Sequence, residues 1–133
     1  MDNYIIIPLL CLLLCQLLKL IIESIKNKKL SFKRFIGGSG GIPSSHTTLI
    51  TSITTLIGLE SNFKGPVFGL SLIALYIICY DAMHVRNEVE KHSKILNKLT
   101  NSNLKEEIGH NFIEVLAGLV FGITITIILY YLF

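Results

Sequence analysis

His110 and Glu114 are the pair of residues in this sequence best suited to chemistry. They lie four positions apart, so a helix would place both on the same face. A carboxylate that accepts a hydrogen bond from an imidazole fixes the ring's tautomer and strengthens its other nitrogen as a base or nucleophile. The alternative is that His110 caps a helix while Glu114 extends toward water. Because a charge inside an apolar run costs on the order of 2.5–3.5 kcal/mol, we expect Glu114 to have a partner.

A second histidine, His46, ends the glycine-rich stretch GGSGGIPSSH at residues 37–46. Glycines let a backbone approach a ligand closely. Pro43 suits the first turn of a helix, which would leave the amides of Ser44, Ser45 and His46 unpaired. Unpaired amides at a helix N-terminus bind anions, phosphate above all. The stretch therefore predicts a phosphate site, and the alternative is a flexible linker ending in a serine N-cap.

A third polar segment, DAMHVR, occupies residues 81–86. The guanidinium of Arg86 can hold an oxyanion, and Asp81 can fix Arg86 in place. Alternatively, these are an ordinary basic residue beside a membrane and a helix-terminal aspartate. We expect His84 and His92 to be residues of the membrane interface.

A metal site is a further alternative, because five of these side chains are possible metal ligands. The sequence has no dense motif such as HExxH, so we expect no metal or other cofactor. The five possible ligands are His46, Asp81, His84, His110 and Glu114.

The composition indicates which class of protein must position these groups. Of the 133 residues, 51% are hydrophobic and only 16% are charged, whereas a soluble domain carries about 25% charged residues. The net charge of +3 is too small for a nucleic-acid-binding polycation, so no nucleic-acid partner is expected. The three cysteines lie in apolar runs without metal-binding spacing. These features indicate a single membrane domain over residues 1–133.

The apolar runs predict an all-α fold, a polytopic membrane helical bundle of about four transmembrane helices. The spans are expected near 4–22, 46–59, 66–83 and 112–133, long enough to cross about 30 Å of hydrocarbon. The second is rich in Thr and Ser, whose hydroxyls can return hydrogen bonds to carbonyls one turn back. Apolar residues at helical spacing over 85–99 predict an interfacial amphipathic helix on the inner membrane face.

The basic residues indicate the orientation. Five of the twelve Lys and Arg lie between residues 23 and 41, and five more between 83 and 109. Because positive residues near spans stay in the cytoplasm, we expect both loops inside and both termini outside. All three polar segments then lie at cytoplasmic span ends. The expectation is an integral protein of a bacterial inner membrane, with its site facing the cytoplasm.

The polar segments together resemble a known family. Residues 43–46 (PSSH) resemble the P-S-G-H motif of the type 2 phosphatidic acid phosphatase and vanadium haloperoxidase superfamily, and His110-x-x-x-Glu114 resembles the H-x-x-x-D end of its last motif. The runs GGIPSSH, YDAMHVR and GHNFIEVLAG are similar to the divergent branch of small bacterial and plant membrane proteins. This resemblance extends from about Phe32 to Gly122.

The resemblance implies roles for the site residues. His110 would attack phosphorus and become a phosphohistidine, Glu114 would orient its ring, and His46 would protonate the leaving alkoxide. The superfamily's K-x6-R-P motif is not found, and Asn103 and Leu104 stand where its Ser-Arg pair would be; Arg86 and Arg34 are proposed as replacements. The predicted phosphate-binding residues are Arg34, Lys33, Gly40, Gly41, Ser44, Ser45 and Arg86, with Asp81 supporting Arg86.

The resulting interpretation is a metal-independent membrane phosphatase that acts on a phosphate monoester or diphosphate of a lipid. Phosphatidate, phosphatidylglycerophosphate and polyprenyl phosphates remain open as substrates. The alternative is a non-enzymatic phospholipid-headgroup binder or translocation subunit with the same anion pocket, and a third is a purely structural protein. The expected partners are the phosphorylated lipid, membrane lipids and further copies of the chain.

The orientation can be tested with topology reporters. A reporter fused after Phe133 should read outside, and one inserted near Asn101 should read inside, because of the charge bias of the two basic loops. Activities of compartment-specific reporter enzymes in cells measure this. Opposite readings at both positions would contradict the cytoplasmic placement.

Overall fold

The computed structural model describes residues 3–27 and 41–133. In chain order these residues form α1 (Asn3–Asn27), α3 (Ser45–Ser61), α4 (Pro66–Tyr80), the π-helix η1 (Asp81–Val85), α5 (Arg86–Thr100) and α6 (Phe112–Leu132). The described chain contains no strand, and the predicted all-α fold is confirmed. Lys33, Arg34 and Gly40, which the sequence predicts to bind phosphate, lie outside the described residues.

Three of the described helices are long and apolar enough to cross a membrane. They are Asn3–Lys26, the continuous helix Pro66–Thr100, and Phe112–Leu132, and they contain the predicted spans at 4–22, 66–83 and 112–133. The span predicted at 46–59 corresponds to α3, which has only 17 residues and is not among the three. Its Thr and Ser residues lower its mean hydropathy. This composition suits a helix that is surrounded by other helices of the bundle instead of lipid.

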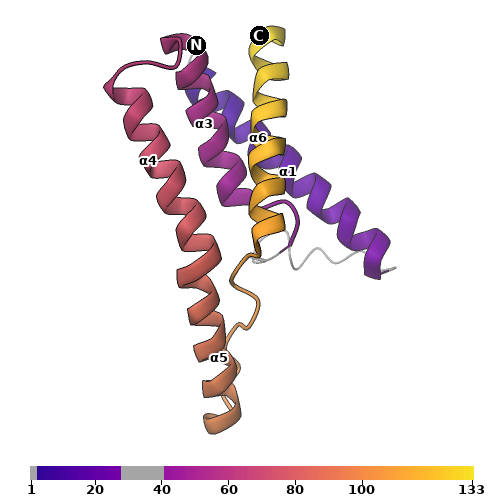
Figure 1. The fold of residues 1–133 in the computed structure, drawn as a ribbon. Helices are drawn as coiled ribbons and strands as arrows, with labels where there is room; N and C mark the ends of the chain where they lie inside the picture. The colour runs from indigo at the N-terminus through magenta and orange to yellow at the C-terminus, as the bar shows by residue number, and fades with distance from the viewer. Residues whose placement is uncertain (1–2, 28–40) are drawn as a thin grey trace.

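α3 lies at the centre of the bundle and packs against α6, α1 and α4 (Figure 1). Its buried face is mostly hydroxyl-bearing. Thr48 Oγ1 donates to the Ser44 carbonyl at 2.9 Å, the bond to the preceding turn expected for such a helix. Thr126 Oγ1 of α6 donates to Ser52 Oγ at 2.7 Å. A helix with these paired hydroxyls is suited to protein neighbours rather than to lipid.

Small residues let α6 approach α3 closely. Gly118, Gly122 and Thr126 recur every four residues on the buried face of α6. A Cβ added at Gly118 would lie 2.8 Å from the Ser44 carbonyl oxygen, and one at Gly122 would lie 2.9 Å from Thr51 Cβ. Spacing of this kind is typical of close helix pairs in membranes.

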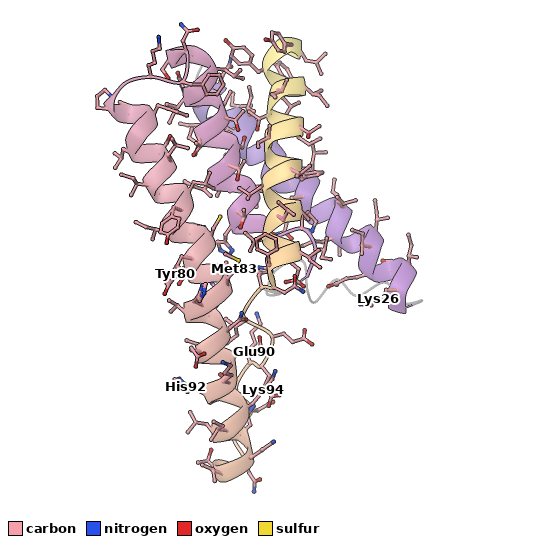
Figure 2. All side chains as sticks on the ribbon, in the orientation of Figure 1. Lys26, Tyr80, Met83, Glu90, His92 and Lys94 are labelled. Atoms are coloured by element: carbon pink, nitrogen blue, oxygen red, sulfur yellow. The ribbon has the colours of Figure 1, made fainter. Side chains whose placement is uncertain are left out.

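α4, η1 and α5 form one continuous rod that extends beyond the rest of the bundle (Figure 1). The Arg86 N–H donates to the Asp81 carbonyl, so the helix passes through the π turn without a break. The predicted amphipathic helix is therefore present as α5, but it continues along the α4 axis instead of turning along the membrane surface. Figure 2 shows Tyr80, Met83, Glu90, His92 and Lys94 in succession along this rod.

The polar segments gather at one end of the bundle. The two chain termini lie together at the opposite end (Figure 1). The Ser44 N–H before α3 donates to the Glu114 carbonyl at 3.0 Å, and the His110 N–H donates to the Ala82 carbonyl at 3.0 Å. These two hydrogen bonds join the starts of α3 and α6 to η1, as the predicted topology requires.

The close contact between α3 and α6 can be tested with glycine substitutions. Gly122→Ala should destabilise the protein by about 1–3 kcal/mol through overpacking, because its Cβ meets both Thr51 and the Thr48 carbonyl. Gly69→Ala in α4 is the matched control, since its Cβ meets nothing within 4 Å. Thermal unfolding in detergent measures the difference. Equal melting of the two variants would contradict the packing described.

Candidate functional site

His110 is held immediately before α6 by a capping box. Asn111 Oδ1 accepts from the Glu114 N–H at 2.9 Å, and Glu114 Oε2 accepts from the Asn111 N–H at 3.1 Å. The same Oε2 lies 2.9 Å from His110 Nδ1, so the predicted imidazole–carboxylate contact is present. An ionised carboxylate only accepts, and Nδ1 is therefore the donor. The proton on Nδ1 leaves Nε2 with its lone pair.

The Nε2 atom of His110 has no hydrogen-bond partner among the described residues, although it is buried. The whole residue is only 2% exposed. A buried polar atom without a partner loses free energy, so native structures contain few of them. The orientation of the ring therefore presents an unshared electron pair inside the protein, as a nucleophile or a base requires.

The backbone around His110 is held by the rod opposite. Asn87 Nδ2 donates to the His110 carbonyl at 3.1 Å, and Glu90 Oε2 accepts from the amides of Ile108 and Gly109, both at 3.2 Å. A Cβ at Gly109 would lie 1.7 Å from Asn87 Oδ1, so a larger residue there would displace the Asn87 side chain. Asn87 and Glu90 thus position the histidine, a role that the sequence did not reveal.

Burial is the main influence on the protonation of His110, and it lowers the pKa of the ring. The hydrogen bond that the ring donates to Glu114 raises this pKa, and the charges of Lys19 and Arg86 lower it. Because desolvation is the largest of these causes and disfavours the charged form, the ring is neutral at pH 7. Neutrality is the state in which Nε2 can attack an electrophile.

His46 lies in the first turn of α3, where its side chain is exposed. It is within electrostatic range of Arg86, His110, Lys19 and Asp81. The charges of Lys19 and Arg86 therefore act on both histidines, although the two rings come from different parts of the chain.

Asp81 and Arg86 form the predicted contact across the π turn. Arg86 Nε donates to Asp81 Oδ2 at 2.6 Å, and both side chains are partly exposed. The carboxylate holds the guanidinium beside the two histidines. Its remaining N–H groups provide donors for an oxyanion.

The structure corrects one of the three amides predicted to be free before α3, that of Ser44. The helix begins at Ser45, and the Ser44 amide donates to the Glu114 carbonyl instead of remaining unpaired. The Ser44 N–H is therefore occupied by the contact between α3 and α6 and is not available to an anion. Ser44 Oγ accepts from Thr47 at 3.0 Å, and both Ser44 and Ser45 are buried. Gly41 is described, with a φ of +95° that favours glycine.

Lys19 is the site residue that the sequence interpretation missed. It comes from α1 and is only 7% exposed, and its charge acts on both His46 and His110. Glu114 and Glu23 act on Lys19 in turn. The signal was available, since a lysine inside an apolar run is as costly as the glutamate that opens α6.

His84 and His92 lie on the exposed surface of the rod, and the possible metal ligands of the described chain are not grouped. His84 stacks on Tyr80 with ring centroids 4.3 Å apart, and His84 and His92 are exposed on the rod. Within residues 3–27 and 41–133, no three His, Cys, Asp or Glu side chains are grouped so that they could hold a metal ion. The five possible ligands of the metal alternative are therefore not brought together as a metal site.

Comparison with known proteins adds an independent observation. A family model described as "Divergent PAP2 family" matches residues 1–125. The uncharacterized membrane protein YuiD of Bacillus subtilis (strain 168) is 30% identical over 146 residues, covering 94% of this chain and 92% of that protein. No solved structure matches the chain significantly.

The charges around His110 should move its pKa in opposite directions when they are removed. Glu114→Gln should lower the pKa further, because the carboxylate raises it, whereas Lys19→Met should raise it, because the ammonium lowers it. Imidazole nitrogen chemical shifts measured by NMR during a pH titration report both changes. In the unsubstituted protein more than half of the His110 rings should be neutral at pH 6.5, the ordinary pKa, because burial lowers the pKa of this ring. A cationic ring at pH 7 would contradict the site described.

Proposed function

We propose that this chain, which belongs to the Divergent PAP2 family, is a membrane phosphatase that hydrolyses a lipid-linked phosphate ester through a phosphohistidine at His110. The observation that carries the proposal is the buried imidazole, with Nδ1 2.9 Å from Glu114 and Nε2 without a partner among the described residues. Family membership supports a phosphatase-related membrane protein. The mechanism is inferred from the geometry of the site together with the family resemblance.

The first step is an in-line attack on phosphorus. The lone pair of His110 Nε2 forms the N–P bond as the bond between phosphorus and the ester oxygen breaks. Protonated His46 donates its proton to the leaving alkoxide, so the alcohol departs neutral. The phosphorylated ring is cationic, and the Glu114 carboxylate at Nδ1 stabilises that charge.

The second step releases inorganic phosphate. Water attacks the phosphohistidine, His46 accepts its proton, and the N–P bond breaks to restore neutral His110. Charge on the equatorial oxygens needs cationic or N–H partners in both steps. Arg86 and Lys19 supply positive charge from two sides of the histidine pair. With the charge bias of the loops, we propose that this chemistry faces the cytoplasm.

A headgroup binder that does not hydrolyse is a second candidate, and one observation favours it. Asn103 and Leu104 replace the superfamily's Ser-Arg pair, and the backbone of Leu104 is held by Asn97 near the far end of α5, through bonds of 2.8 and 2.9 Å. The far end of α5 lies away from the start of α6 (Figure 1). An anion pocket with fewer donors stabilises the charge of the transition state less. Losing donors therefore lowers the rate of hydrolysis more than it lowers the affinity for the phosphate group.

Phosphate release by the purified protein distinguishes the two candidates. His110→Gln should abolish release from any phosphate ester, because the nucleophile is lost. His46→Ala should slow release from an alkyl phosphate by about 10²–10⁴-fold, and less for an aryl phosphate whose leaving group needs no proton. His92→Gln, on the exposed face of α5, is the matched control and should retain full activity.

The contrary outcomes are equally specific. Undiminished turnover by His110→Gln would refute the phosphohistidine. Phospholipid binding without phosphate release by the unsubstituted protein would establish the binder instead. Activity lost on chelation and restored by a divalent cation would favour a metal mechanism.

A further inference from the structure

A groove of about 400 Å³ lies between α1, α3 and α4, and its lining is almost wholly apolar. Pro8 and Leu9 line it from α1, and Ile78 lines it from α4. The α3 wall consists of His46, Leu49, Ile50 and Ile53. His46 is thus a wall of the groove and also a member of the proposed site.

The spacing on α3 sets the direction of the groove. Positions 46, 49, 50 and 53 are i, i+3, i+4 and i+7, so they share one face of the helix. At 1.5 Å per residue, the stretch from His46 to Ile53 is roughly 10 Å long. From its first turn, α3 runs toward the end of the bundle that carries both termini (Figure 1), so this face of the helix leads in the same direction.

From this continuity we infer that the groove holds a hydrocarbon chain joined directly to the phosphate ester oxygen of the substrate. The inference rests on the proposed function, in which His46 protonates that oxygen. Beyond His46 along α3, the next groove side chains are Leu49, Ile50 and Ile53, and none of them can donate or accept a hydrogen bond. The α3 wall beyond the leaving oxygen is therefore apolar.

This arrangement discriminates between two classes of lipid phosphate. In an alkyl or prenyl phosphate the oxygen is followed by hydrocarbon, which fits the groove. In a glycerol-linked lipid such as phosphatidate it is followed by glycerol and ester groups, whose carbonyls would be buried without partners. Because bilayer lipid is as apolar as the groove walls, the groove contributes alignment of the ester with His46 and His110 rather than hydrophobic affinity.

The first test compares substrates in one detergent. Unsubstituted protein should hydrolyse dodecyl phosphate with a kcat/KM about five- to 150-fold above that for phosphatidate, equivalent to about 1–3 kcal/mol for an unpaired buried polar group. Preference for phosphatidate would overturn the inference while leaving the phosphatase proposal intact.

The second test narrows the groove. Ile53→Trp from α3, or Leu9→Trp from α1, should lower kcat/KM severalfold for dodecyl phosphate and much less for butyl phosphate, because a four-carbon chain ends before Ile53, roughly 10 Å along α3 from His46. Leu70→Trp is the matched control, because Leu70 is 67% exposed on α4 and does not line the groove. Equal losses for both substrates in both groove variants would overturn the inference.

A binding measurement separates this inference from the proposed function. Dodecyl phosphate carrying a diazirine at its chain end should label the α3 wall on irradiation, and unlabelled dodecyl phosphate should compete. Labelling there without any phosphate release would support the groove and refute the phosphatase. Labelling spread over outward residues such as Leu70 and Val120, without competition, would refute the groove.

Discussion

Glu114 joins the residue before α3 to the two residues before α6, and the site depends on this junction. Its carbonyl accepts the Ser44 amide, and its amide donates to Asn111 Oδ1. Its carboxylate oxygen Oε2 accepts from both His110 Nδ1 and the Asn111 N–H. One residue thus fixes the start of α3, the start of α6 and the tautomer of the histidine. A carboxylate at the edge of an apolar helix is tolerated only with such partners, so the site and the helix junction stabilise each other.

This junction requires α3 and α6 to lie unusually close, and the sequence of both helices serves that contact. Lipid tails give no hydrophobic reason for two helices to associate, so small residues and interhelical hydrogen bonds must do so. Gly118 and Gly122 remove the side chains that would strike α3, and Thr126 adds a hydroxyl bond to Ser52. The Thr-rich composition that makes α3 a poor lipid-facing span is therefore what suits it to the centre of the bundle.

The sequence predicted the helices and the His110–Glu114 contact well, because both follow from local spacing. Apolar runs define helices, and a separation of four residues places two side chains on one face. The predictions from sequence were wrong or incomplete where contacts between residues far apart in the chain determine the structure. The Ser44 amide seemed free because its acceptor, the Glu114 carbonyl, is 70 residues away. The direction of α5 depends on the unbroken π turn, and the roles of Asn87 and Glu90 depend on where the 101–111 segment returns along the rod.

The two faces of α3 explain how one short helix can serve both assembly and recognition. Thr47, Thr48 and Thr51 are buried on the face that packs against neighbouring helices, where Thr48 Oγ1 donates to the Gly118 carbonyl at 3.3 Å. The face that carries Leu49, Ile50 and Ile53 borders the groove. His46 begins this second face, at the end where Glu114 has fixed the first turn. The hydrogen bonds that assemble the bundle therefore also fix the position of His46, one turn before the apolar residues Leu49 and Ile50. In the proposed mechanism, the leaving group must consequently extend along α3, away from the charged end of the bundle.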